Sequence, residues 1–243
     1  MYRYTEEINW KAHFWFDKKL VTSKIWARLP KASKSVFPVV GCYRNDRGLA
    51  FPSERTIAIL CGRTDKTVRT GIRGLDGLYN LKILPYITSR GRRSKKFYLA
   101  APPRKPGRAF PFYRCVLEKG LWQALTPTAQ ALYPVMRTFG FFDQDMYRSF
   151  DDPDFKEEDF DRVYRERDFD YCEADPLQLV LHAGISRQSL EAALRSLEKN
   201  NLVQVADRDP SGHPWLWRVY FKTKSWYPRD LLNDRIAKRY GSR

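Results

Sequence analysis

The stretch Phe51–Leu75, FPSERTIAILCGRTDKTVRTGIRGL, predicts two short helices joined by a tight turn. Ser53 stands before the first apolar run and Gly62 after it, and these residue types are preferred at the start and just past the end of a helix. Thr64 then precedes a second run in which apolar residues recur at the spacing of one helix face: Val68, Ile72, Leu75 and Leu78. The pattern is that of a helix-turn-helix.

A β-hairpin is predicted directly after the second helix. Leu81–Thr88 and Lys96–Ala100 have strand-like composition, and a polar tip separates them. A helix-turn-helix followed by a two-stranded hairpin indicates a winged helix. Further upstream, Pro38 lies within an expected helix, which we expect to be bent there because proline lacks a donor and its ring clashes with the preceding turn.

The chain contains an internal repeat of this pattern. At an offset of 96 residues, the residues before the helix-turn-helix recur: Trp26, Leu29, Val36, Phe37, Pro38 and Val39 match Trp122, Leu125, Leu132, Tyr133, Pro134 and Val135. At an offset of 122, the helix-turn-helix itself recurs: Ile57, Gly62, Thr64, Val68, Ile72, Arg73 and Leu75 match Leu179, Gly184, Ser186, Leu190, Leu194, Arg195 and Leu197. Amphipathic helices alone do not require shared Trp, Pro and Gly positions, so two copies of one domain fit better than coincidence.

The second copy carries the same helix signals. Asp175 is the expected cap of its first helix, with Pro176 at the first helical position, and Ser186 is the expected cap of the helix after Gly184. The preceding helix is expected to bend at Pro134, as the first copy does at Pro38. A hairpin follows, with two strands and a tip at Leu202–Ala206, Trp215–Phe221 and Asp207–His213.

We therefore expect an α+β protein with two winged-helix domains in tandem. The offset grows by 26 residues between the two matched blocks, which places an insertion in the second copy, and the proline-rich Ala101–Gly107 predicts a linker. The expected segments are an N-terminal arm (1–22), a first domain (23–100), a basic linker (101–110), a second domain (111–222) with an acidic insertion (143–175), and a basic C-terminal helix (223–243).

Charge is unevenly distributed along the chain. The net charge is +16, yet residues 143–175 contain 14 acidic and 5 basic side chains, a net charge of −9, which leaves +25 on the remaining residues. Because 15% of the residues are aromatic, the excess charge is expected on a folded surface, where it favours a polyanionic partner. The alternative is a solvated surface rich in lysine and arginine. For the acidic segment, shielding of the basic surface and docking of a basic partner both remain open.

The segments Phe51–Ala58 and Cys61–Leu75 resemble the helix-turn-helix of winged-helix modules found in bacterial, phage and plasmid replication and regulatory proteins. The resemblance covers residues 29–100 well and residues 125–221 more loosely, because of the insertion. Two such domains in one chain are similar in plan to plasmid replication initiators. The resemblance implies sequence-specific binding of double-stranded DNA by a transcriptional regulator or replication initiator of a bacterial chromosome or mobile element.

The exposed face of the second helix supplies the candidate base-reading residues, because the N-terminal part of this helix enters the major groove. In the first copy they are Asp65, Lys66, Thr67, Arg69 and Thr70, and in the second copy Arg187 and Gln188. The candidate phosphate contacts come from both copies and from the first hairpin tip: Arg63, Arg73, Arg90, Arg92, Arg93, Lys95, Lys96 and Arg195. The alternative is a solvated helix face and a solvated charge run.

The second copy is a weaker DNA reader. Glu191 takes the place of Arg69, and the second hairpin tip is not basic. Direct DNA contact and a dimerisation or partner-binding role both remain open for this copy, so an adaptor is the alternative to a regulator or initiator. Trp215 and Trp217 share one strand face and are expected in the core rather than as base-stacking residues.

No enzymatic activity, cofactor or metal is expected. The chain has no phosphate-binding glycine loop and no paired histidines, and its four cysteines lack zinc-ligand spacing, so we expect them to be reduced and buried. The carboxylates of Asp151–Asp154 and Glu157–Asp159 could hold magnesium but better fit a solvated acidic loop, and His182 is expected to be a core residue.

The chain has no long apolar stretch and no signal-like start, so the protein is expected in the cytoplasm, associated with the nucleoid and without membrane contact. Its possible partners, besides double-stranded DNA, are a second copy of itself or a replication or transcription protein.

Overall fold

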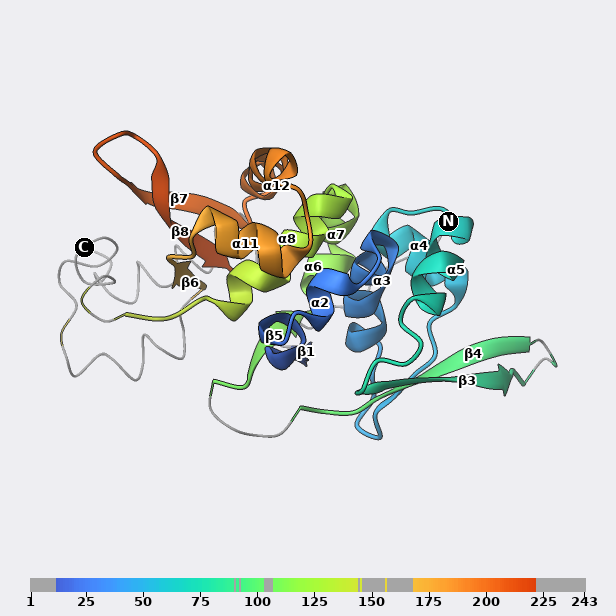
Figure 1. Ribbon diagram of the computed structural model, residues 1–243. Helices are drawn as coiled ribbons and strands as arrows, with labels where there is room; N and C mark the ends of the chain where they lie inside the picture. The colour runs from blue at the N-terminus through green and yellow to red at the C-terminus, as the bar shows by residue number, and fades with distance from the viewer. Residues whose placement is uncertain are drawn as a thin grey trace, which may run out of the picture.

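A computed structural model describes residues 12–89, 91, 93–102, 107–143, 145, 156 and 168–221, and every structural statement below concerns these residues. Helices and small antiparallel sheets alternate along the chain, which confirms the expected α+β class (Figure 1). Among the described helices, none has the length and apolar character needed to cross a membrane.

The first half of the chain begins with a strand and several short helices and ends with a hairpin. Its elements are β1 (His13–Asp17), α1 (Lys19–Thr22), α2 (Ile25–Arg28), α3 (Lys31–Cys42), β2 (Leu49–Ala50), α4 (Glu54–Cys61), α5 (Asp65–Arg73), β3 (Leu81–Ile87) and β4 (Arg93–Leu99). Strand β1 and helix α1 fall within the segment expected as an N-terminal arm. These two elements bury Phe14, Phe16, Leu20 and Val21 in the core.

The second half repeats this order. Its elements are β5 (Ala109–Tyr113), α6 (Cys115–Glu118), α7 (Leu121–Ala124), α8 (Pro127–Thr138), β6 (Phe169–Cys172), α11 (Pro176–Ala183), α12 (Arg187–Lys199), β7 (Val203–Arg208) and β8 (Pro214–Tyr220). From β5 to α8 every element begins and ends 96 residues after its counterpart, and α11 lies 122 residues after α4. The repeat detected in the sequence is thus a repeat of structure. Helices α3 and α8 both continue through their internal proline.

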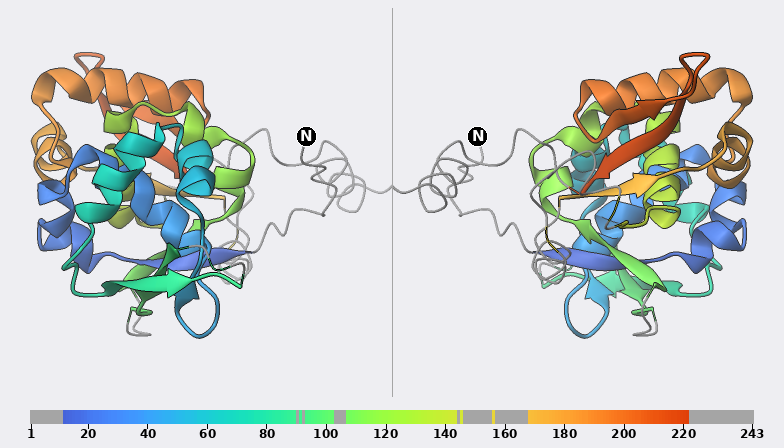
Figure 2. Two further views of the ribbon diagram at one scale, coloured as in Figure 1. Left: turned by 90° about the vertical axis from the view of Figure 1, so that its right-hand side faces the viewer. Right: turned by 90° about the vertical axis from the view of Figure 1, so that its left-hand side faces the viewer.

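Each half has a three-stranded antiparallel sheet with the same strand order, β2-β4-β3 in the first and β6-β8-β7 in the second. Ala50 pairs with Phe97 in the first sheet as Cys172 pairs with Trp217 in the second. The two hairpins lie at opposite ends of the molecule (Figure 2). Trp217 is buried, as expected, whereas Trp215 is half-buried and its Nε1 donates to Asp207 Oδ2 at 3.1 Å.

Strands β1 and β5 join the two halves in a third, two-stranded sheet. Trp15 pairs with Pro111, its own counterpart at the 96-residue offset, so a local two-fold axis passes between these residues. Phe14 and Phe16 on β1 and Phe110 and Phe112 on β5 turn inward, and the Phe16 and Phe110 rings stack at 4.9 Å. Ala109 and Phe110, expected at the end of the linker, therefore belong to this sheet.

Hydrogen bonds across the two halves obey the same two-fold relation. Trp26 Nε1 donates to the Ala131 carbonyl at 2.8 Å, and its counterpart Trp122 donates from Nε1 to the Ser35 carbonyl at 2.9 Å. Both indole rings are fully buried within one apolar cluster that takes side chains from both halves. The two copies thus pack as the subunits of a symmetric dimer do, within a single chain.

All four cysteines are free and buried, as the sequence predicts. Burial raises the pKa of the Cys61 thiol to about 11 and that of Cys172 to about 12, so both stay protonated at neutral pH. Helix-capping positions also follow the sequence: Ser53, Thr64 and Asp175 each accept a backbone N–H with the side chain. At Ser186 the hydroxyl instead lies 2.8 Å from Ser189 Oγ, without a side-chain cap bond.

Candidate nucleic-acid interface

Helices α4 and α5 are joined by a short turn, and the geometry of this helix pair depends on three local signals. Ser53 Oγ accepts from Thr56 N at 3.0 Å at the start of α4, and Thr64 Oγ1 accepts from Thr67 N at 3.3 Å at the start of α5. Between them Gly62 has a φ of +65°, a left-handed conformation that glycine adopts without strain. The turn therefore sets the direction in which α5 leaves the core.

The inner face of α5 is anchored by small and apolar residues. Val68 and Ile72 are buried, and Gly71 lies so close to α3 that a Cβ there would come within 2.7 Å of the Ala32 carbonyl oxygen. Because this face is committed to α3, the opposite face points away from the core. Side chains exposed on α5 are Asp65, Lys66, Arg69, Thr70 and Arg73.

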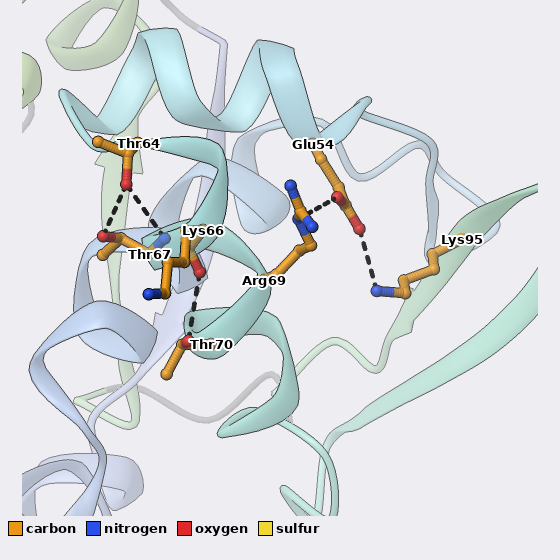
Figure 3. A network of polar contacts seen from close by, with 7 residues as sticks. All are labelled: Glu54, Thr64, Lys66, Thr67, Arg69, Thr70 and Lys95. Carbon is orange, nitrogen blue, oxygen red and sulfur yellow. Dashed lines mark hydrogen bonds and ion pairs between the residues drawn. The ribbon is translucent and has the colours of Figure 1, made fainter.

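The two threonines of the candidate base-reading set face different partners. Thr67 is half-buried, and its Oγ1 lies 3.0 Å from Oγ1 of the capping Thr64. Thr70 is exposed, and its Oγ1 donates to the Lys66 carbonyl at 3.2 Å within the same helix (Figure 3). Thr70 therefore offers both a methyl group and a hydroxyl acceptor to an outside partner, whereas Thr67 chiefly supports the helix start.

A carboxylate connects the exposed face of α5 to the hairpin. Glu54, the first residue of α4, lies with Oε2 at 3.5 Å from Arg69 Nε and with Oε1 at 3.1 Å from Lys95 Nζ of β4 (Figure 3). The three side chains are 38–60% exposed. In this arrangement Glu54 occupies the position between two cations that an anionic ligand would otherwise take.

The β3–β4 hairpin carries the basic residues singled out at its tip. Arg93 is exposed, Lys95 and Lys96 are half-buried, and Lys95 is the one that reaches Glu54. Arg90 and Arg92 lie outside the residues that the structure describes. The hairpin extends beyond the helices, as Figure 1 shows.

Arg63, expected as a phosphate contact, lies in the packing between the two halves. Its guanidinium donates to the Gly62 carbonyl at 3.0 Å and to Gln130 Oε1 at 2.8 Å, and burial lowers its pKa. A side chain held in this way contributes to the cross-half interface. Because Arg63 precedes the cap of α5, sequence position alone could not distinguish this inward orientation from an outward one.

The second half presents a different surface. Arg187 and Gln188 are exposed at the start of α12, as predicted, but Arg195 forms an ion pair with Glu191 at 3.3 Å on the same helix. Its hairpin tip is held by Asp209, whose Oδ1 accepts backbone N–H groups from Ser211 and His213 at 2.9 and 2.8 Å. Most of the acidic insertion and the expected C-terminal helix lie outside the described residues, including both carboxylate clusters.

His182 at the end of α11 is half-buried rather than fully enclosed. Its Nδ1 lies 2.9 Å from the Val21 carbonyl oxygen, and its ring packs edge-on against Phe139. Among the described residues, no group of three or more His, Cys, Asp or Glu is arranged so that it could hold a metal ion. The histidine therefore belongs to the packing of α11 on α1.

The role of Glu54 could not be found from the sequence. Its position just after the Ser53 cap is typical of an acidic residue in a first helical turn, where it interacts with the helix dipole. Only the folded arrangement brings Arg69 and Lys95 to it, from 15 and 41 positions away. Comparisons of this chain with protein-family models, with curated proteins and with solved structures gave no match.

Proposed function

We propose that each half is a winged helix and that the first one binds double-stranded DNA. The observation that carries this proposal is the exposed face of α5, with Lys66, Arg69 and Arg73. A basic hairpin lies next to this face, and Glu54 contacts both, through Arg69 of α5 and Lys95 of β4. A helix of this kind fits the major groove, and a basic hairpin beside it can contact phosphates or the minor groove.

The chemistry of the α5 face suits recognition of both bases and backbone. Lys66 and Arg69 can donate to guanine O6 and N7, and Thr70 can contact a thymine methyl group or a polar base edge. Arg73, one helical turn after Arg69, is placed to hold a phosphate. The net charge of +25 outside the acidic segment supplies the long-range attraction to DNA.

The second half supports an alternative role, as a partner-binding domain. Arg195 forms an ion pair with Glu191. In the second hairpin tip, the Asp209 carboxylate accepts hydrogen bonds from backbone N–H groups of the tip itself. Helix α11 also exposes Leu177 and Leu181, which are 66% and 51% exposed and lie one turn apart. These features favour an adaptor in which the first half binds DNA and the second contacts a protein, over a regulator or initiator that reads DNA with both halves.

The test is selection of preferred sites from random duplex DNA, followed by affinity measurements on the preferred site and on random sequence. Lys66→Ala should cost about 1–3 kcal/mol on the preferred site and much less on random DNA, because a base contact is lost. Lys199→Ala, an exposed lysine at the far end of α12, is the matched control and should change neither affinity. Equal losses on both DNAs would show that Lys66 contacts phosphate only, and absence of any duplex binding would refute the proposed function.

A further inference from the structure

The first sheet has one face that no described helix covers. Side chains alternate along a strand, so Leu81, Phe97 and Leu99, which are buried against the helices, define the inner face. The residues between them point the other way. This outer sheet face consists of Lys82, Leu84 and Tyr86 on β3, Lys96 and Tyr98 on β4, and Phe51, which directly follows β2.

Aromatic rings and cations are interleaved on the outer sheet face. Tyr98 pairs with Lys82 across the strands, and Lys96 pairs with Leu84. Phe51 is 46% exposed and Tyr98 40% exposed, and the Phe51 and Tyr86 ring centroids are 5.3 Å apart. Two exposed aromatic rings thus share one sheet face with Lys82 and Lys96.

The backbone beneath Tyr98 is built to accept its ring. Gly48 has a φ of +81°, and a Cβ at this position would lie 3.0 Å from Tyr98 Cε2. The ring therefore lies against glycine backbone, which limits the positions that it can take. A ring held in this way loses little conformational freedom when a flat ligand stacks on it.

The second sheet shows that the fold itself does not require this surface. By strand register, Arg218 corresponds to Tyr98 and Leu216 to Lys96, and Leu216 is fully buried in the second half. Glu173 stands where the first half has Phe51. The combination of aromatic residues and lysines on this face is therefore particular to the first half.

Charge indicates the kind of partner. The hairpin from Leu81 to Leu99 contains six basic residues and no acidic residue. Exposed rings next to cations match a ligand that alternates flat π-systems with negative charge, which describes the bases and phosphates of an unpaired strand. A protein partner would be better served by a continuous apolar patch than by rings separated by lysines.

We propose that the outer sheet face binds single-stranded nucleic acid. Bases stack on Phe51 and Tyr98, with Tyr86 supporting Phe51, and Lys82 and Lys96 contact the phosphates. In Figure 1 the helices lie on one side of the β3–β4 hairpin, and the buried residues of this sheet belong to the same apolar cluster as those of α5. The aromatic part of the single-strand site is therefore separate from the duplex-binding face of α5, whereas Lys96 belongs to the hairpin that takes part in both proposals.

Fluorescence anisotropy with labelled oligo(dT) and oligo(rU) of about 12 nucleotides tests the proposal on the full chain. Phe51→Leu and Tyr98→Leu each keep an apolar side chain and remove the ring, and each should weaken binding about tenfold. Ile59→Ala, which is 56% exposed on α4, is the matched control and should leave the affinity unchanged. Comparison of the two oligonucleotides distinguishes DNA from RNA as the ligand.

Two further measurements separate this proposal from duplex binding. Lys66→Ala should weaken binding to duplex DNA and leave oligonucleotide binding unchanged. Photocrosslinking of the wild-type protein to an iodouracil-containing oligonucleotide should modify peptides that contain Phe51, Tyr86 or Tyr98, and this readout does not depend on a variant that folds. Crosslinks confined to α5, unchanged affinity in both leucine variants, or no binding of either oligonucleotide would overturn the proposal.

Discussion

At the residue scale, Lys34 and Gln130 occupy equivalent positions in the two halves, and each donates a hydrogen bond to a helix-end carbonyl of the other half, one through an ammonium group and one through an amide. Lys34 Nζ donates to the Ala183 carbonyl at 2.8 Å, at the end of α11 in the other half. Gln130, its counterpart, donates from Nε2 to the Cys61 carbonyl at 3.1 Å, at the end of α4. Each side chain thus satisfies a helix-end carbonyl that has no partner within its own helix.

The burial of Lys34 predicts a pH-dependent stability. Desolvation, with a smaller contribution from Lys31, lowers its pKa from 10.5 to about 8 in the folded protein. Between pH 8 and 10.5 the unfolded chain therefore binds more protons at Lys34 than the folded protein does. The free energy of unfolding should rise with pH across this window, and this contribution is lost as pH falls through 8. Urea unfolding at several pH values should show this rise in the wild type relative to Lys34→Gln, which introduces the amide found at position 130. Parallel pH profiles for the two proteins would contradict the assignment.

At the element scale, Glu54 links helix α4, helix α5 and strand β4. Its ion pairs are exposed, and pairs of this kind contribute about 0–1 kcal/mol to stability, so they are not needed for the fold. Their effect is on the charge available to a ligand. A carboxylate at this position attracts two of the proposed DNA-binding cations and repels phosphate.

Glu54→Gln should therefore tighten binding to random duplex DNA several-fold. If Arg69 and Lys95 become free to contact phosphates, the plot of log affinity against log salt should steepen by up to about two units. Anisotropy across a salt series measures both quantities. Glu118→Gln is the control, because Glu118 pairs with Arg114 on α6 at 2.7 Å, outside the proposed interface, and should leave them unchanged. An unaltered slope and affinity in Glu54→Gln would show that the pairs do not compete with DNA.

The turn between α4 and α5 predicts a second effect at this scale. Gly62 and Gly77 both have positive φ, at +65° and +84°, so alanine strains the backbone at either position by roughly 1–2 kcal/mol. Of these two positions, only Gly62 would bring the added Cβ against another element: it would lie 2.6 Å from the carbonyl oxygen of Gln123, in helix α7 of the second half. Gly62→Ala should cost roughly 1–3 kcal/mol more than Gly77→Ala in urea unfolding. Equal losses would mean that the turn and the second half can move apart without penalty.

At the scale of the whole molecule, the two halves share a core. Strands β1 and β5 pair across the two-fold axis, and Trp26 and Trp122 each donate a hydrogen bond into the other half. One continuous apolar cluster cannot be opened in one half without exposing surface of the other. Each half thus stabilises its neighbour.

Unfolding should accordingly occur in one transition. Circular dichroism and tryptophan fluorescence should report the same midpoint in denaturant, as in a two-state protein. Trp26→Phe and Trp122→Phe should each lower that common midpoint, with a loss of roughly 1–3 kcal/mol, because a buried hydrogen bond and part of a fully packed ring are lost. Trp15→Phe is the control, since Trp15 is 53% exposed. Two resolved transitions, each moved by one substitution, would show that the halves fold independently.

The sequence by itself determined the local structure. Ser53, Thr64 and Asp175 cap helices and Gly62 and Gly184 end them because these effects act within one turn of backbone. Helical periodicity likewise identified Lys66, Arg69 and Arg73 as the outer face of α5, and the 96- and 122-residue offsets identified the repeat.

Only the tertiary structure decided how these parts combine. Lys34 and its acceptor at Ala183 are 149 residues apart, and Arg63 and Gln130 are 67 apart, so no local pattern relates them. The same applies to the pairing of β1 with β5, to the inward direction of Arg63 and to the contacts of Glu54. Such contacts depend on which faces become adjacent when the two copies bury a common apolar surface. The hydrophobic effect that drives this burial has no preferred direction, so close packing of the side chains selects the arrangement.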